Sequence, residues 1–367
     1  MDKLLFFFFS IYPIAFLIGN FVINFFTVIF FFLFIYNILT KKIKINDENK
    51  ILIYLLIFLF ISLLINLIFS NNFLLTFPRV FKFLLIIGSI FAFRLLIRSY
   101  NENEINLLYK IWSIIFFIVV IDIIFEYFFK TNTIGLKSII PGRLTSFTGK
   151  EMIIGHFFSA FVLIVLTYIH LNYKNKYLDI LLAFGFIILS FLIGERSNFV
   201  KTFIIINLFL FFIVDIKFRF KLISVSLIII FFISFLNFNK YYKLRYFDQV
   251  SKLLNKEGIN LYLEESFYGA HYKVATEIFK DNPIFGVGIK NFRIESYSSK
   301  YDDLDHKHWD RRGNTHPHQI HYEFLSETGL FGYLAFMIFI LISLYLFFNS
   351  YKKNKNIYQF SGMLFIL

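Results

Sequence analysis

Long apolar runs separated by short polar connections fill most of the chain. A helix that crosses a bilayer needs about 20 apolar residues. Runs of this kind fall at 4–18, 20–39, 51–69, 82–97, 109–129, 152–171, 178–193, 198–214, 219–236 and 320–348. Another begins near Ile357 and stops at Leu367, too short to span, so either the chain is a truncated fragment, which we favour, or this segment is only partly inserted. The pattern predicts an all-α, polytopic integral membrane protein of about 11–12 transmembrane helices.

One long polar segment interrupts this pattern and divides the chain into three parts. Residues 1–236 are predicted to hold transmembrane helices 1–9, and residues 237–318 to form a helical extracytoplasmic loop domain. Residues 319–367 then hold an interfacial helix, transmembrane helix 10 and the start of an incomplete helix 11. Inside the loop domain, the stretch from Glu264 to Lys280 has helical spacing of Phe267, His271, Val274, Ala275 and Ile278.

The composition agrees with a membrane protein and excludes several kinds of site. Of the 367 residues, 58% are hydrophobic and 17% charged, which leaves more apolar surface than one soluble core can bury. Cysteine is absent, so disulfides, thiolate nucleophiles and cysteine metal sites are excluded.

The basic residues predict the orientation in the membrane, because short cytoplasmic loops retain Lys and Arg. Alternate connections are basic, at Lys41, Lys42, Lys44 and Lys50, at Arg98 and Lys110, at Lys174 and Lys176, at Lys217, Arg219 and Lys221, and at Lys352, Lys353 and Lys355. These loops account for the formal net charge of +13 without a nucleic-acid partner. The connections at 130–151 and 194–197 and the segment 237–318 are then extracytoplasmic.

Three cations on the predicted outer side are exceptions to this rule. Arg196, in a tight Gly-Glu-Arg-Ser turn, either pairs with Glu195 or reaches headgroups, or it binds an anion such as the pyrophosphate of a lipid carrier. Arg143 and Lys150 flank a loop rich in Gly, Ser and Thr. These two residues serve either capping and interface anchoring or substrate contact.

Five histidines, at 306, 308, 316, 318 and 321, invite a metal interpretation. We favour a metal-free site, because His306 and His308 lie in a charged stretch typical of solvated loop. His316 and His318 flank Pro317, which suits the first turn of a helix. This places His318 at a helix start, where a positioned imidazole can accept a proton.

The last apolar segment is too long for one straight span. From 320 to 348 a helix would measure about 43 Å, against a hydrocarbon core of about 30 Å. Gly329 and Gly332 predict a break, so that the piece carrying Glu323 and Glu327 lies at the interface. An upstream Gly286-Val-Gly288 is no dinucleotide site, because no strand precedes it and the third glycine is missing.

The motif from Thr315-His-Pro-His-Gln319 to Glu327-Thr-Gly329, with Gly332, resembles the H-x-H-N…E-x-G-x-x-G signature of the O-antigen ligase and O-antigen polymerase family. The Arg143 loop, Gly194-Glu-Arg-Ser197 and Asn282-Pro-Ile-Phe-Gly-Val-Gly288 occur in the family's order. The resemblance covers most of the chain through short motifs. Gln319 departs from the usual asparagine and keeps an amide with a different reach.

The resemblance implies a metal-independent glycosyltransferase, without cofactor, in the bacterial inner (cytoplasmic) membrane with its active site facing the periplasm. It would move a glycan from an undecaprenyl-pyrophosphate donor to a hydroxyl acceptor, either lipid A core or another glycan. His318 would be the base or orienting group, with His316 beside it and Glu327 in support. Arg143, Arg196, Lys150 and Gln319 would bind substrate. We favour a ligase slightly over a polymerase.

A non-enzymatic transporter of lipid-linked glycans is the alternative class of function. It would need charges near the membrane midplane and repeated halves. The candidates within spans are Asp122, Glu126 and His156, which could instead pair with basic neighbours or help His318. No internal repeat is evident, which weakens the transporter hypothesis.

Overall fold

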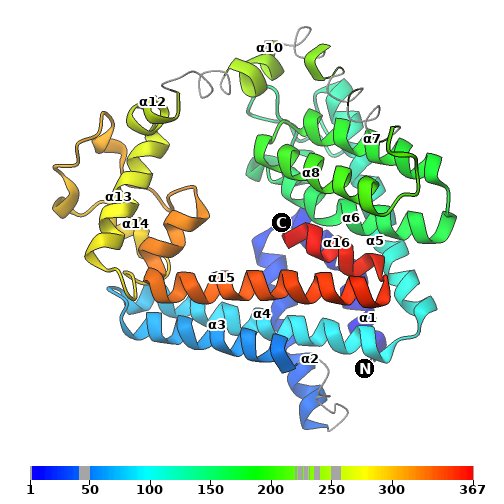
Figure 1. Cartoon of the computed structure of the whole chain (residues 1–367), viewed down its shortest axis with the longest axis horizontal. Coiled ribbons are helices and arrows are strands. Elements are labelled where there is room, and N and C mark those ends of the chain that lie inside the picture. Colours follow the sequence, from blue (N-terminus) through cyan, green and yellow to red (C-terminus); the bar gives the residue numbers. More distant parts are fainter. Residues whose placement is uncertain are drawn as a thin grey trace. The chain divides into compact units, whose positions relative to one another are not determined.

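A computed structural model describes residues 2–40, 50–219, 240–248 and 258–366, together with 221, 226, 230 and 232–234. All regular elements in these residues are helices, which confirms the all-α class (Figure 1). The α-helices are α1 (Asp2–Ile18), α2 (Asn20–Leu39), α3 (Lys50–Ile68), α4 (Phe73–Ser99), α5 (Glu102–Phe129), α6 (Ile154–Tyr173), α7 (Lys176–Ile193), α8 (Arg196–Phe212), α10 (Lys240–Tyr242), α12 (Gly258–Glu265), α13 (Phe267–Asp281), α14 (Phe292–Glu295), α15 (Ile320–Asn354) and α16 (Ile357–Ile366). Short 3-10 turns form η2 (Ser146–Glu151), η4 (Ser299–Tyr301) and η5 (Trp309–Arg311), and η3 (Lys243–Asp248) is a π-helix.

Seven helices in the described part are long and apolar enough to cross a membrane, which supports a polytopic membrane protein. They are α2, α3, α4, α5, α6, α7 and α15. Helices α1 and α16 are shorter apolar helices, and α8 has 17 residues. Most of the apolar run predicted at 219–236 falls outside the described residues.

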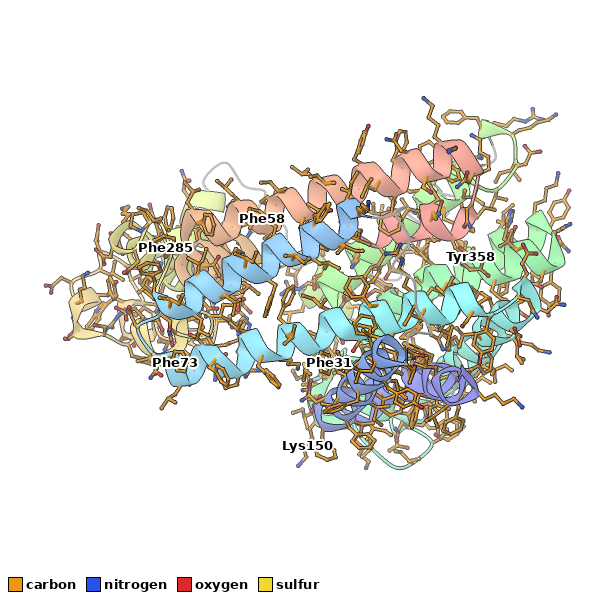
Figure 2. All side chains as sticks on the ribbon, turned by 90° about the horizontal axis from the view of Figure 1, so that it is seen from below. Phe31, Phe58, Phe73, Lys150, Phe285 and Tyr358 are labelled. Atoms are coloured by element: carbon orange, nitrogen blue, oxygen red, sulfur yellow. The ribbon has the colours of Figure 1, made fainter. Side chains whose placement is uncertain are left out.

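The chain divides into two compact units, and the first contains the larger core. Unit 1 consists of Met1–Phe34, Phe91–Val250 and Leu346–Leu367. Its core is mainly aromatic and aliphatic, with Phe9 and Phe30 stacked at 3.9 Å between ring centroids. Trp112 packs in the same core and donates its indole N–H to the Phe9 carbonyl at 2.8 Å, so α1 and α5 are joined by a polar bond inside an apolar layer. Figure 2 shows the side chains on the ribbon, with Phe31 of α2 labelled.

Unit 2 consists of Ile35–Ile90 and Ser251–Tyr345. In it α15 runs alongside α3 and α4 (Figure 1). Outside these helices a small core forms around Val274, Ala275, Ile278, Val287, Phe292 and Tyr301. Helix α13 supplies the first three, as its spacing predicts, and ends at Asp281 with Asn282 as C-cap. It begins later than predicted, because the Ser266 side chain accepts from the Gly269 N–H and caps it, and Phe267 is exposed.

The predicted break in the last long helix lies at Gly329. Its φ of 63° and ψ of −172° are non-helical, in a region of backbone space that is essentially limited to glycine. The prediction was wrong for Gly332, which stays helical. A Cβ on Gly332 would meet the Thr328 side chain at 2.5 Å, so this glycine serves close packing.

Candidate functional site

The broken helix is completed by the segment that carries Gly286 and Gly288. Because the break leaves backbone groups of α15 without helical partners, this segment bonds to both sides of it. The N–H groups of Val287 and Gly288 donate to the carbonyls of Ser326 and Glu327 at 3.1 and 2.8 Å. The N–H groups of Leu330 and Phe331 donate to the carbonyls of Pro283 and Ile284 at 2.8 and 3.1 Å.

The glycines at this junction are required by the closeness of the two backbones. A Cβ on Gly286 would lie 2.5 Å from the Glu327 carbonyl oxygen, and a Cβ on Gly329 would lie 2.4 Å from that of Ile284. Both residues also have positive φ, at +68° and +63°. The Gly-x-Gly pattern therefore packs backbone against backbone.

Asn66 connects the junction to α3, and sequence reasoning missed this residue. Its Nδ2 donates to the carbonyls of Phe285 and Glu327 at 2.7 and 2.8 Å. Its Oδ1 accepts from the Ile289 N–H at 3.1 Å. The one signal in the sequence is an amide inside an otherwise apolar run.

The start of α15 differs from its prediction. The helix begins at Ile320, and the Gln319 Oε1 accepts from the Tyr322 N–H at 2.9 Å as its cap. Pro317 therefore precedes the helix and does not occupy its first turn. His318 has a φ of 61°, the left-handed conformation that is uncommon outside glycine. The exposed His318 ring is thus presented by a strained turn and not by a helix start.

The structure brings His316 and His318 together and adds two groups that the sequence did not indicate. The two imidazole centroids are 4.2 Å apart. Asn314 Nδ2 lies 3.1 Å from His318 Nε2 and 3.2 Å from Nε2 of His271, a buried residue of α13. Partial desolvation by the surrounding groups, followed by the charge of His316, lowers the pKa of His318, and burial lowers the pKa of His271. Both rings are therefore neutral at pH 7.

The other histidines of the cluster have separate partners. His306 Nε2 lies 2.8 Å from the Leu263 carbonyl, and His321 Nδ1 lies 3.0 Å from the Tyr333 hydroxyl. Across the described ranges, no group of three or more His, Asp or Glu side chains is arranged to bind a metal ion.

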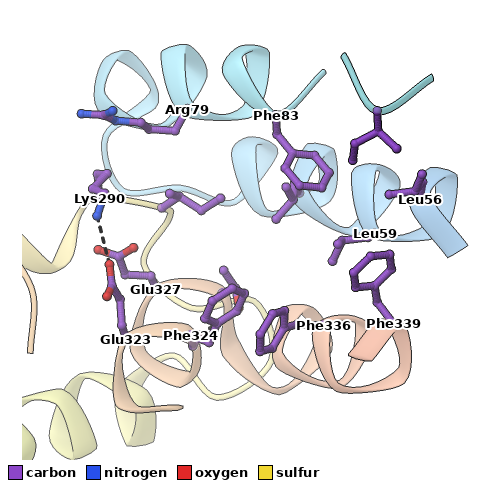
Figure 3. Close-up of a pocket in the computed structure, with 14 residues that line it drawn as sticks. Leu56, Leu59, Arg79, Phe83, Lys290, Glu323, Phe324, Glu327, Phe336 and Phe339 are labelled. Atoms are coloured by element: carbon purple, nitrogen blue, oxygen red, sulfur yellow. Dashed lines mark hydrogen bonds and ion pairs between the residues drawn. The ribbon is translucent and has the colours of Figure 1, made fainter. Parts of the chain in front are cut away.

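An apolar cavity of about 400 Å³ lies between α3, α4 and α15 of unit 2 (Figure 3). Leucine and phenylalanine side chains form most of its wall: Leu56, Leu59, Leu63, Phe83, Phe324, Phe336 and Phe339. Arg79, Lys290, Glu323 and Glu327 form its charged end (Figure 3). Lys290 Nζ and Glu323 Oε1 are paired at 3.0 Å. Sequence reasoning did not single out Arg79, which follows Pro78 within α4.

Glu327 is the buried acid of this charged end. Its side chain is 3% exposed, and its Oε1 atom has no hydrogen-bond partner among the residues that the structure describes. A buried carboxylate oxygen without a partner is costly. This atom is therefore available to a hydroxyl or amine of a bound molecule.

The loop that carries Arg143 in unit 1 is anchored by two buried acids of α5. Glu126 accepts from the backbone N–H groups of Thr145 and Ser146, the latter at 2.7 Å. Asp122 accepts from the Thr133 N–H at 2.8 Å and from the Ser146 hydroxyl at 2.5 Å. Both acids thus bond to backbone and hydroxyl groups of the loop, so these acids shape the loop.

Arg143 forms an ion pair with Glu195, the residue that the sequence suggested as a partner of Arg196. Its Nη2 lies 3.2 Å from Glu195 Oε1 and donates to the Met152 carbonyl at 2.6 Å. The two turns touch at their glycines, where a Cβ on Gly194 would lie 2.0 Å from the Gly142 carbonyl oxygen. The Gly194-Glu-Arg-Ser turn and the Arg143 loop are therefore one packed structure.

Arg143 and Arg196 line different pockets. Arg196 lines an open pocket of about 550 Å³ with Ser197 and Lys201, whereas Arg143 lines a different one of about 240 Å³ with Glu126 and Lys130. Lys150 lies on η2 with its side chain exposed (Figure 2). All three candidates belong to unit 1, and the histidines and Glu327 belong to unit 2. Their convergence at one site stays a prediction.

Comparison with known proteins supports one family. Residues 180–337 match the family model described as O-antigen ligase. The matched range contains the Arg196 turn, the glycine segment, both histidines and the broken part of α15. A search of curated proteins found no match to the chain.

Proposed function

We propose, from the match of residues 180–337 to the O-antigen ligase family, that the chain transfers a glycan from undecaprenyl pyrophosphate to a hydroxyl acceptor at the periplasmic face of the bacterial inner membrane. The acceptor oxygen forms a bond to the anomeric carbon while the bond from that carbon to the pyrophosphate oxygen breaks. The protein has to receive the hydroxyl proton and stabilise the departing charge.

The observation that carries this proposal is the presentation of His318. Its ring is exposed, neutral at pH 7 and held by Asn314 beside His316. An imidazole so placed either accepts the proton of an acceptor hydroxyl or orients the substrate by a hydrogen bond. The backbone carbonyl of Glu327 accepts from the Gly288 N–H and so supports the helix break at Gly329.

The donor requires cations for its pyrophosphate and an apolar surface for its isoprenoid chain. We assign the first task to Arg143, Arg196 and Lys150, because guanidinium forks match phosphate oxygens. The cavity of unit 2, apolar along its wall and charged at one end, suits the membrane-embedded part of such a lipid (Figure 3). Gln319 contributes to substrate binding by capping α15 directly after the turn that carries His318.

A transfer assay with purified protein tests this proposal. His318→Ala should lower the rate by about 10²–10⁴-fold, the usual contribution of acid–base groups, with no change in membrane insertion. His306→Ala is the matched control and should retain most activity, because its ring bonds to the Leu263 carbonyl of α12. Near-normal activity of His318→Ala would falsify the assignment. The assignment would also be wrong if a chelator abolished activity and added zinc restored it.

A gene deletion separates the two acceptors, since ligase and polymerase share this chemistry. We expect loss of every repeat unit from lipid A core, with lipid-linked chains accumulating, as for a ligase. Single repeats retained on core, with only long chains lost, would instead identify a polymerase. Gel analysis of the surface glycan gives this readout.

A further inference from the structure

A chain of hydrogen bonds connects the buried His271 to the exposed His318 through one amide. His271 Nδ1 lies 3.0 Å from the Arg312 carbonyl oxygen, Asn314 Nδ2 lies 3.2 Å from His271 Nε2, and the same Nδ2 lies 3.1 Å from His318 Nε2. Each link has a definite donor, and the donors can be assigned in order along the chain.

The order begins at the Arg312 carbonyl, which only accepts hydrogen bonds. His271 Nδ1 must therefore carry the proton, and because this buried ring is neutral its Nε2 is a lone pair. That lone pair needs a donor, which the Asn314 Nδ2 supplies. The second N–H of the same amide then points to His318 Nε2, which must also be a lone pair.

An independent contact fixes the orientation of the Asn314 amide. The backbone N–H of Thr315 donates to Asn314 Oδ1 at 2.6 Å, so the oxygen faces Thr315 and the nitrogen faces the two rings. The reverse orientation would place an oxygen against the His271 lone pair and an NH₂ group against the Thr315 N–H. Both constraints lead to the same assignment.

We propose that His271 and Asn314 are positioning residues that hold neutral His318 in its Nδ1–H tautomer, so that His318 acts on substrate as a hydrogen-bond donor. The acceptor of this bond is an oxygen that gains negative charge in the reaction, as the pyrophosphate oxygen does when the glycosidic bond breaks. This inference rests on the proposed glycosyl transfer and assigns His318 one of the two roles left open above.

The proton of the acceptor hydroxyl then goes to His316, the neighbouring ring. The Thr315 hydroxyl donates to Asn314 Oδ1 at 3.4 Å and lies 2.9 Å from His316 Nδ1. It therefore accepts from His316 Nδ1–H, which leaves Nε2 of His316 as the lone pair that takes the proton. The two histidines thus present opposite groups, a donor on His318 and an acceptor on His316.

Other ionisable groups that face His318 influence its titration. They are His316, His271 and Glu323, together with Tyr268 of α13, whose ring centroid lies 5.3 Å away. The two histidines disfavour a second positive charge, whereas Glu323 favours it. Replacing any of these groups would shift the titration, so the test changes Asn314 and leaves them in place.

Magnetic resonance of the purified protein with ¹⁵N-labelled histidine tests the tautomer directly. The His318 signals are assigned by their loss in His318→Ala. Above pH 7 we expect a protonated Nδ1 and an unprotonated Nε2, the less common form of free imidazole. A protonated Nε2 in the unaltered protein would overturn the inference.

Asn314→Asp is the decisive variant, because a carboxylate accepts and cannot donate. It should draw a proton to His318 Nε2, reverse the tautomer and raise the pKa of His318. Transfer should fall by about tenfold or more above the raised pKa, where neutral His318 has lost its Nδ1–H. It should recover as the pH drops below that pKa, because protonated imidazole donates from both nitrogens. A purely structural role would lower activity equally at every pH. Asn260→Asp adds the same charge to an exposed site on α12 and should change neither readout.

Asn314→Ala keeps the test valid if the aspartate variant fails to fold. It removes both donors, so His318 should revert to the common Nε2–H tautomer. An unchanged tautomer in either folded variant contradicts the inference even when transfer is normal. If the unaltered protein shows the expected tautomer but transfers no glycan, the proposed function fails while the positioning network stands.

Discussion

Buried acids lie in apolar helices of both units, yet they have different surroundings. In unit 1, Asp122 and Glu126 accept several bonds from the Thr133–Ser146 part of the Arg143 loop. In unit 2, Glu327 has an oxygen atom without a partner in the described residues, and it faces a cavity. Acids whose oxygens all accept hydrogen bonds shape a loop, whereas a buried acid with an unsatisfied acceptor oxygen is available to a ligand.

The same contrast applies to the backbone. The turn at Gly194 packs against Gly142 and ends α7, so its strain is compensated by a helix cap. The break at Gly329 lies inside one long helix and is compensated by the segment 283–288 and by Asn66, which come from elsewhere in the chain. Unit 2 therefore depends on tertiary contacts to keep its site, and substitutions there should have the larger effects.

The largest effect is expected for Gly329→Ala. A Cβ at this position would lie 2.4 Å from backbone atoms of Ile284, and the φ and ψ values are strained for any other residue. Strain alone costs about 1–3 kcal/mol, and the clash adds to it. We expect loss of folded protein and of activity, measured by thermal unfolding in detergent.

Gly185→Ala is the matched control for this substitution. Gly185 lies in α7, and a Cβ added there would meet no atom of the described residues within 4 Å, so alanine should be tolerated or slightly stabilising. Equal stability of the Gly329→Ala and Gly185→Ala proteins would show that the junction is not what holds the site.

Arg196→Lys should lower glycan transfer without lowering stability. Lysine keeps the charge but not the planar fork, and loss of one charge-assisted bond of about 1.5–3 kcal/mol corresponds to roughly 10–100-fold. Arg196 is exposed in its pocket and lysine keeps its positive charge, so stability should change little. Arg219→Lys, in a connection predicted to be cytoplasmic, is the control. Equal activity of the two variants would remove Arg196 from the donor site.

A matched pair of acid-to-amide variants tests the contrast between the two units. Glu126→Gln replaces an acceptor oxygen by NH₂ against the N–H groups of Thr145 and Ser146, and should cost about 1–3 kcal/mol of stability. Glu327→Gln should cost less, because its Oε1 has no partner to lose in the described part of the chain. It should instead reduce transfer. The opposite pattern in unfolding and activity assays would refute the contrast.

The helices and the break could be predicted from sequence because both are local. Apolar runs determine the spans, and Gly329 lies where a single span becomes too long. The partners of the site are not local. Asn66 and His271 are far along the chain from the groups they bond, and the φ of His318 depends on the turn around it. The sequence pattern placed Pro317 in the first turn of the helix, whereas it lies in the turn before the helix. A proline fits both positions, so the sequence alone does not distinguish them.

The smallest effect is a loss of stability in acid that is confined to unit 2. Burial lowers the pKa of His271 below its usual value near 6.5. The unfolded chain therefore binds a proton more readily than the folded one, so stability is fully present above about pH 6.5 and falls as the pH drops below it. Protease digestion of the α12–α13 region should accelerate from pH 7 to pH 5.5. His271→Asn, whose amide does not titrate, should remove this acceleration. An unchanged pH dependence in that variant would assign it to other groups, of which His318 shifts in the same direction.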